Sequence, residues 1–247
     1  MHAIAYDEIH DEIVVPQPFS AAILTFRGGA NGQEAPIRVI QGPLTQLYNY
    51  VDQLAIDPVH NEIYVADGYP EKDHVKVFGR EANGNVAPIR VLQGPDAFHG
   101  VSSVSVDPVH DLLLVSGQTA AGVPGVMIFD RTAQGNAKPR GVISGPKTDF
   151  GGSGSGRIHV YPPRGLFIKV IQPKGSSSSE PGGAKEFIGV WSIDDRGDVP
   201  PRWMIGGPKD GIHEWIFDAT LDPKHKSVII SDGRLNAVAT YFFPEIF

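Results

Sequence analysis

One twelve-residue stretch, which the chain repeats, decides the fold. Residues Leu54–Val65 read LAIDPVHNEIYV, and residues Val104–Val115 read VSVDPVHDLLLV. Three further copies begin at Ile4 (IAYDEIHDEIVV), Ile158 (the looser IHVYPPRG) and Ala219 (ATLDPKHKSVII). The turn of the motif therefore falls at residues 7, 57, 107, 161 and 222, at separations of 50, 50, 54 and 61. Regular self-similarity at this period indicates a repeat architecture of five units.

Each unit is expected to form four short strands. The first alternates apolar residues up to Asp-Pro, and the second is a β-branched run such as residues 63–65. The third is exemplified by residues 75–78, and a hairpin at Asn83-Gly84 leads to the fourth strand at residues 89–92. Gly-Pro follows the fourth strand at residues 42, 94, 145 and 207. The sequence thus predicts an all-β chain, a β-propeller of four-stranded blades of about 50 residues.

The motif API-R-V-I-Q-G-P followed by D-P-V-H-N-E-I-Y-V resembles the blades of NHL-type propellers, of the bacterial six-bladed kind. The resemblance covers the whole chain and implies one propeller domain, residues 1–247. The repeats are expected at residues 2–52, 53–102, 103–156, 157–216 and 217–247. Because such families include binding modules as well as enzymes, the fold does not select the function.

The last repeat is expected to lack its outer strand. Residues 219–243 supply three strands before the sequence stops at Phe247, and only Met1-His2 precedes the first inner strand. One interpretation is an N-terminally truncated copy of a longer protein, for which export remains open although no signal-peptide pattern follows Met1. The other is an open or five-bladed ring whose free strand edge is covered by a protein partner or by self-association, because an unpaired apolar edge must be capped.

Composition excludes several classes. The sequence holds 28 acidic and 21 basic residues, a formal charge of -7, which disfavours nucleic acid as a partner. It contains no Cys, so disulfides, thiolate metal sites and cysteine nucleophiles are excluded. No apolar run approaches the roughly 20 residues of a membrane span.

Candidate binding residues lie in the loops that differ between repeats. The turn histidines His10, His60, His110 and His225 recur at one position, which indicates a role in the turn, and His159 in an inner strand is expected to be a satisfied core residue. The inter-blade loops instead vary and carry aromatic, histidine and charged side chains, which is typical of recognition surfaces. The candidate binding residues are Tyr48, Tyr50, Asp52, Phe98, His99, Phe150, Arg157, His213 and Trp215.

Some of these positions are expected to surround the mouth of the central channel, where His2, Asp52 and Asp218 are candidate ligands for Ca²⁺, Mg²⁺ or Zn²⁺. Ser102 and Gly156 would leave a gap in that ring of ligands. The resemblance to propeller lactonases and streptogramin-type lyases implies, as the alternative function, a metal-dependent hydrolase or lyase with its site there. No catalytic residue is assigned. The leading prediction is a non-catalytic recognition or scaffold propeller that binds a protein or a small ligand through its variable loop face.

Overall fold

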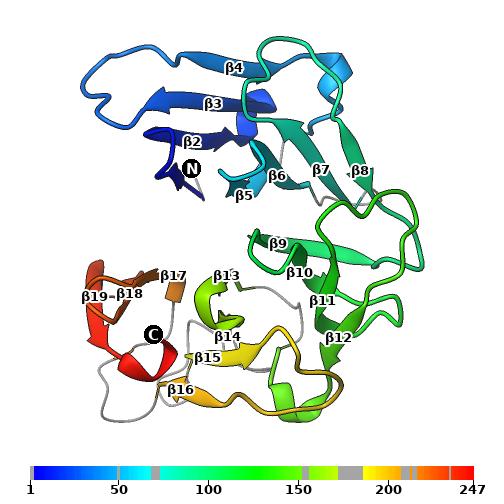
Figure 1. Cartoon of the computed structure of the whole chain (residues 1–247), viewed down its shortest axis with the longest axis vertical. Helices are drawn as coiled ribbons and strands as arrows, with labels where there is room; N and C mark the ends of the chain where they lie inside the picture. The colour runs from blue at the N-terminus through cyan, green and yellow to red at the C-terminus, as the bar shows by residue number, and fades with distance from the viewer. Residues whose placement is uncertain are drawn as a thin grey trace.

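The computed structural model of the chain shows five antiparallel β-sheets arranged around a central axis, with no α-helix among the residues it describes (Figure 1). Those residues are 3–48, 51–67, 73–151, 156–171, 186–206, 212, 216–233 and 235–247, with the backbone alone at Asp52. No helix in these ranges is long and apolar enough to cross a bilayer. The prediction of an all-β propeller is confirmed.

Each sheet is one blade, and its strands follow each other outward from the axis in sequence order. Blade 1 contains β1 (Ala5–Asp7), β2 (Glu12–Gln17), β3 (Ala22–Arg27) and β4 (Arg38–Gln41). Blade 2 contains β5 (Val51–Asp57), β6 (Glu62–Asp67), β7 (His74–Gly79) and β8 (Arg90–Leu92). Blade 3 contains β9 (Gly100–Asp107), β10 (Leu112–Gln118), β11 (Pro124–Asp130) and β12 (Gly141–Ser144). Blade 4 contains β13 (Ile158–Tyr161), β14 (Leu166–Ile171), β15 (Phe187–Ser192) and β16 (Trp203–Ile205). Blade 5 contains β17 (Ile216–Asp222), β18 (Ser227–Asp232) and β19 (Ala237–Phe242).

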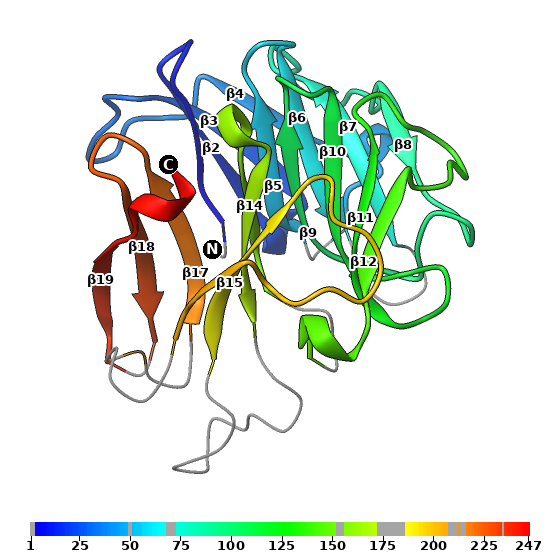
Figure 2. The same cartoon turned by 60° about the horizontal axis from the view of Figure 1, so that its bottom comes forward.

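In the part of the chain that the structure describes, blade 5 has three strands, as the sequence predicts. After β19 the chain turns into the short 3-10 helix η5 (Pro244–Ile246) instead. Ile246 is buried in the core between blades 4 and 5, and the Phe247 ring meets that of Tyr161 edge-on at 5.1 Å. The end of the chain therefore packs back on blade 4 rather than pairing with β19 (Figure 2).

The turn between the first two strands is built by its aspartate and histidine. In blade 2, Asp57 accepts a hydrogen bond from the backbone N–H of His60 at 3.0 Å and contacts the His60 ring Nδ1 at 2.7 Å. Blades 1, 3 and 5 repeat the ring contact at 2.7–2.9 Å. The turn histidines therefore serve local structure, as their repetition predicts.

Consecutive blades are also joined by main-chain hydrogen bonds at their outer strands. Gly84, in the hairpin of blade 2, bridges Ile40 of β4, and its N–H donates to the Val39 carbonyl at 2.6 Å. Asn85 then accepts from the N–H of Leu44, just after the Gly-Pro of blade 1, at 2.7 Å. The same bridge recurs between blades 2 and 3 and between blades 3 and 4. We call this arrangement the hairpin clasp.

The hydrophobic core is divided into layers between neighbouring blades. Four clusters of buried residues fill the interfaces of blades 1 and 2, 2 and 3, 3 and 4, and 4 and 5. None of these clusters, which rest on the described part of the chain, joins blade 5 to blade 1. Figure 1 accordingly shows an arc with an open sector between β17–β19 and the first blade.

An ionic network reinforces the interface of blades 2 and 3. The Glu62 carboxylate accepts two hydrogen bonds from Arg90, at 2.8 and 2.7 Å, and one from Arg131 of blade 3 at 2.7 Å. Burial works to raise the pKa of Glu62, but the hydrogen bonds and charges of the arginines outweigh it and hold the pKa below its usual value. Glu62 is therefore ionised at neutral pH and ties the two blades together.

Candidate binding site

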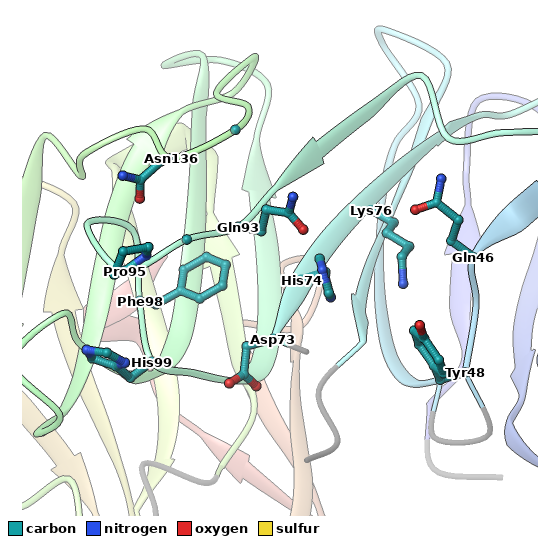
Figure 3. A pocket seen from close by; sticks show the side chains of 12 residues that line it. Gln46, Tyr48, Asp73, His74, Lys76, Gln93, Pro95, Phe98, His99 and Asn136 are labelled. Carbon is teal, nitrogen blue, oxygen red and sulfur yellow. The ribbon is translucent and has the colours of Figure 1, made fainter. Parts of the chain in front are cut away.

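One candidate site is a cavity of about 840 Å³ at the end of blade 2, on the side of the inter-blade loops (Figure 3). Its walls come from the connection between blades 1 and 2, from the start of β7, from the loop that follows β8, and from the hairpin of blade 3. The residues that line it are Gln46, Tyr48, Asp73, His74, Lys76, Gln93, Gly94, Pro95, Phe98, His99, Gly135 and Asn136. We call it the blade-2 cavity.

Three of the predicted binding residues meet in this cavity. Tyr48 and His99 are exposed, whereas Phe98 is buried, with its ring edge-on to Phe129 at 6.2 Å. Figure 3 shows Tyr48 on one side and Phe98 with His99 on the other, so the cavity separates them. Phe98 is thus a core residue that forms part of the wall, not an exposed contact as the sequence alone led us to expect.

A buried ion pair underlies one wall. Lys76 is in the middle of β7, and its side chain is almost fully buried and bonded to the equally buried carboxylate of Asp67. The Lys76 ammonium also lies 5.0 Å from the centre of the Tyr48 ring, a cation–π distance. Because Asp67 neutralises Lys76, the pair anchors the tyrosine without adding net charge to the cavity.

Most of the other lining groups are polar and able to hydrogen-bond. Gln46, Gln93 and Asn136 contribute side-chain amides, His74 and His99 contribute imidazoles, and Asp73 contributes a carboxylate whose Oδ1 accepts from the Val101 N–H at 3.2 Å. Such a wall offers both donors and acceptors at several points.

The hairpin clasp shapes the upper wall. Asn136 Oδ1 accepts from the Asp96 N–H at 2.8 Å, which fixes the loop after Gly94. Gly94 has φ 118°, and a Cβ at this position would lie 2.5 Å from Asn136 Oδ1. Only glycine lets the chain turn this closely under the asparagine.

Phe150 belongs to a different part of the molecule. It lines a smaller cavity of about 570 Å³ beside β11 and the loop after β12, and its buried ring lies edge-on to Trp191 at 5.0 Å. Next to it, buried Lys169 donates to Ser116 Oγ at 2.7 Å and to the Gly156 carbonyl at 3.0 Å. Burial lowers the pKa of Lys169 to about 7. Phe150, like Phe98, is a core residue rather than an exposed one.

Arg157 and Asp218 form an ion pair near the axis. Arg157 donates to one oxygen of Asp218, and the other oxygen lies 3.1 Å from His159 Nε2. Burial works to raise the pKa of Asp218, but His159 and Arg157 outweigh it and hold the pKa below its usual value. His159 is therefore satisfied, yet its side chain is 37% exposed, so it is not the core residue that we expected.

The predicted metal ligands do not form a cluster in the described part of the chain. In those ranges no group of three His, Cys, Asp or Glu side chains is placed to hold a metal ion. The register also shifts at Asp52 and at Phe217, so Phe217 rather than Asp218 is the blade-5 counterpart of Asp52. The candidate residues His2, Tyr50, His213 and Trp215 lie outside the described residues, as does the side chain of Asp52.

Several lining residues were not singled out from the sequence. Lys76 interrupts the apolar run Val75-Lys76-Val77-Phe78, and a lysine within a strand otherwise made of core residues is a signal for a buried ion pair. Asn136 and Gln93 gave no such signal, because their place on the cavity depends on how one blade lies against the next.

Comparisons with known proteins support the fold and do not identify a function. No protein-family model and no curated protein matches the sequence. Among solved structures, the chain is similar to one described as Kuenenia stuttgartiensis hydrazine synthase, with a TM-score of 0.61 and 11% identity. The match covers 92% of this chain and 54% of that chain, so this chain spans about half its length. At this identity the likeness shows a shared fold only.

Proposed function

We propose that the protein is a non-catalytic recognition scaffold of the NHL-like propeller type that binds a small, uncharged polar ligand in the blade-2 cavity. The observation that carries the proposal is the convergence of Tyr48, Phe98 and His99, from two different inter-blade loops, on one cavity of about 840 Å³. That volume is within the range of about 300–1,000 Å³ that is usual for ligand pockets.

The lining supports the ligand class. Three side-chain amides, two imidazoles and one carboxylate offer hydrogen bonds, while Tyr48 and Phe98 supply aromatic surface. The ammonium of Lys76 is already neutralised by Asp67, so the pair adds no net charge to the wall, and the Asp73 carboxylate is the remaining acidic group there. A ligand that combines several hydroxyl or amide groups with an apolar face matches these walls.

A ligand titration tests the proposal. A panel of monosaccharides, nucleosides and dipeptides is titrated into the ¹⁵N-labelled protein, and amide shifts are expected at residues 46–48, 73–76 and 93–99. For any ligand found, Tyr48→Ala and His99→Ala should each weaken binding tenfold or more. Phe19→Ala, which removes a side chain 89% exposed on blade 1, is the matched control and should leave affinity unchanged. Shifts confined to other regions, or no binding by the whole panel at millimolar concentration, would refute it.

A further inference from the structure

The face of blade 5 that looks into the open sector carries residues that every other blade buries. The pairing registers align Val238 of β19 with one position in each other blade. These residues are Ile23, Val75, Val126 and Ile188, and each is 0% exposed against the next blade. Val238 is 73% exposed. Blade 5 therefore presents an inter-blade face without its neighbour.

Blade 1 presents the complementary face at the other end of the arc. The turn register aligns Ile4 with Leu54, Val104, Ile158 and Ala219, which are between 1% and 8% exposed because the preceding blade covers them. Ile4 is 66% exposed. The two ends thus continue, on either side of one open sector, the interface that the chain itself builds four times (Figure 1).

The chemistry of both faces is that of a blade interior. On blade 5 the aligned positions include Thr220, Ile229, Val238 and Thr240, and the register adds two aspartates, Asp218 and Asp222. Both aspartates already have partners in the chain: Asp218 is bonded to Arg157 and His159, and Asp222 to His225. On blade 1 the aligned positions are Ile4, Tyr6, Ile13, Leu24 and Phe26. Apolar faces of this extent are a liability unless another element covers them.

A third feature of the open sector is the hairpin of blade 1, which holds no outer strand of a preceding blade within the described residues. Asn31-Gly32-Gln33 in blade 1 corresponds to Asn83-Gly84-Asn85, and Gly32 has φ 60°, in the same region as the 80° of Gly84. Gly84 holds the outer strand of the preceding blade, whereas within the described ranges no strand bridges Gly32. All three residues of the blade-1 hairpin are exposed.

We propose that a four-stranded antiparallel sheet of the same blade type, formed by residues outside 1–247, inserts between blade 5 and blade 1. One of its faces covers Val238 and its neighbours, and the other covers Ile4 and its neighbours. Its outer strand ends in apolar-polar-Gly-Pro, the sequence that the hairpin clasp holds in blades 1 to 3. This surface is separate from the blade-2 cavity and does not depend on its ligand.

A second copy of the chain does not fit the open sector. The inserted sheet must have two free faces, because it contacts both ends of the arc. Within the described residues, blades 2, 3 and 4 have both faces covered by neighbouring blades. In the same residues, blades 1 and 5 each have one covered face and one free face. Copies could therefore only join end to end, which extends a chain of molecules instead of closing the arc.

The test adds one blade in trans. A polypeptide copying residues 103–148, the blade-3 repeat through its Gly-Pro, is mixed with the full chain and followed by analytical ultracentrifugation and hydrogen exchange. A one-to-one complex is expected, with slower exchange at β1 and β19. Val238→Asp and Ile4→Asp should each weaken binding tenfold or more. Val109→Asp, at a turn residue 67% exposed on blade 3, is the matched control and should bind normally.

A second arm covers the case in which the single repeat does not remain soluble. The same repeat is fused after Phe247 through a Gly/Ser linker, and the melting temperature is compared with that of the unfused chain. A rise of about 5 °C or more is expected, and Val238→Asp should abolish it. No complex in trans together with no rise in the fusion would overturn the proposal. So would end-to-end self-association of the chain that Val238→Asp dissolves and the added repeat leaves unchanged.

Discussion

Replacing Lys169 by methionine should stabilise the protein most at neutral and acidic pH. Lys169 is buried between blades 3 and 4, and its hydrogen bonds to Ser116 and Gly156 go to neutral oxygens. Burial disfavours the ammonium form and lowers the pKa of Lys169 to about 7. In the unfolded chain the lysine keeps a pKa of about 10.4 and is protonated at neutral pH. Folding at that pH therefore either removes the proton from Lys169 or buries the charged ammonium.

The size of the effect follows from linkage. Between pH 7 and about 10 the unfolded state binds the proton and the folded state does not, so the stability of the native protein rises with pH. With the pKa of Lys169 at about 7, the penalty on folding is roughly 4 kcal/mol at pH 7 and roughly 2 kcal/mol at pH 9. Below pH 6 the penalty stays constant, because both states are then protonated.

Methionine removes this penalty and fills a similar volume. It also removes the hydrogen bonds to Ser116 and Gly156, at a cost of about 1–3 kcal/mol, but that loss does not vary with pH. The quantity that tests the prediction is therefore the change with pH in the stability difference between Lys169→Met and the native protein. The advantage of Lys169→Met over the native protein should shrink by about 2 kcal/mol between pH 7 and pH 9.

Urea denaturation at pH 6, 7, 8 and 9 measures this change, with unchanged m-values as the check on two-state unfolding. Lys76→Met is the matched control, because Lys76 is equally buried but bonded to the Asp67 carboxylate. Its removal leaves a buried carboxylate without its cation and should destabilise the protein by about 3–5 kcal/mol. A difference between Lys169→Met and native protein that is constant from pH 6 to 9 would refute the reasoning.

Three further predictions concern the inter-blade contacts. Glu62→Gln should lower the free energy of unfolding by about 3 kcal/mol in urea titrations, because Arg90 and Arg131 lose their shared counter-charge; a loss below about 1 kcal/mol would contradict this. Asp218→Asn should destabilise the protein at pH 7. The contribution of Asp218 is complete above its unfolded-state pKa of about 4 and is lost as the pH falls through the lower folded-state pKa, so acid titration should make the two proteins converge. Gly94→Ala should cost about 1–3 kcal/mol, because φ 118° and the amide of the next blade leave no room for a Cβ; an unchanged melting temperature would disprove it.

Much of the fold was predictable because each blade is specified locally. The alternation around residues 54–65, the Asp-Pro-x-His turn and the Asn-Gly hairpin fix strand length and register within one repeat. The looser copy at Ile158 has Tyr161 in place of the turn aspartate and still forms the same pair of strands, with Gly165 at φ 56°. Repetition made the argument strong, since five weak signals agree.

The candidate site was predictable only in part. The rule that variable inter-blade loops gather on one face grouped Tyr48, Phe98 and His99, and the structure brings the three together at the blade-2 cavity; their role in binding stays a prediction. It could not separate exposed aromatic residues from buried ones, because Phe98 and Phe150 lie in loops that fold inward against the next blade. Nor did it find the ion pair between Lys76 and Asp67, because these two residues lie on neighbouring strands of blade 2, β7 and β6.

The sequence by itself determined the strands, the turns and their repetition, because these depend on contacts within about fifty residues. Only the tertiary structure decided that the blade-2 cavity exists and that the ends of the arc stay apart. Both follow from how one sheet packs on the next, and that packing depends on side chains from separate repeats, which no single stretch of sequence contains.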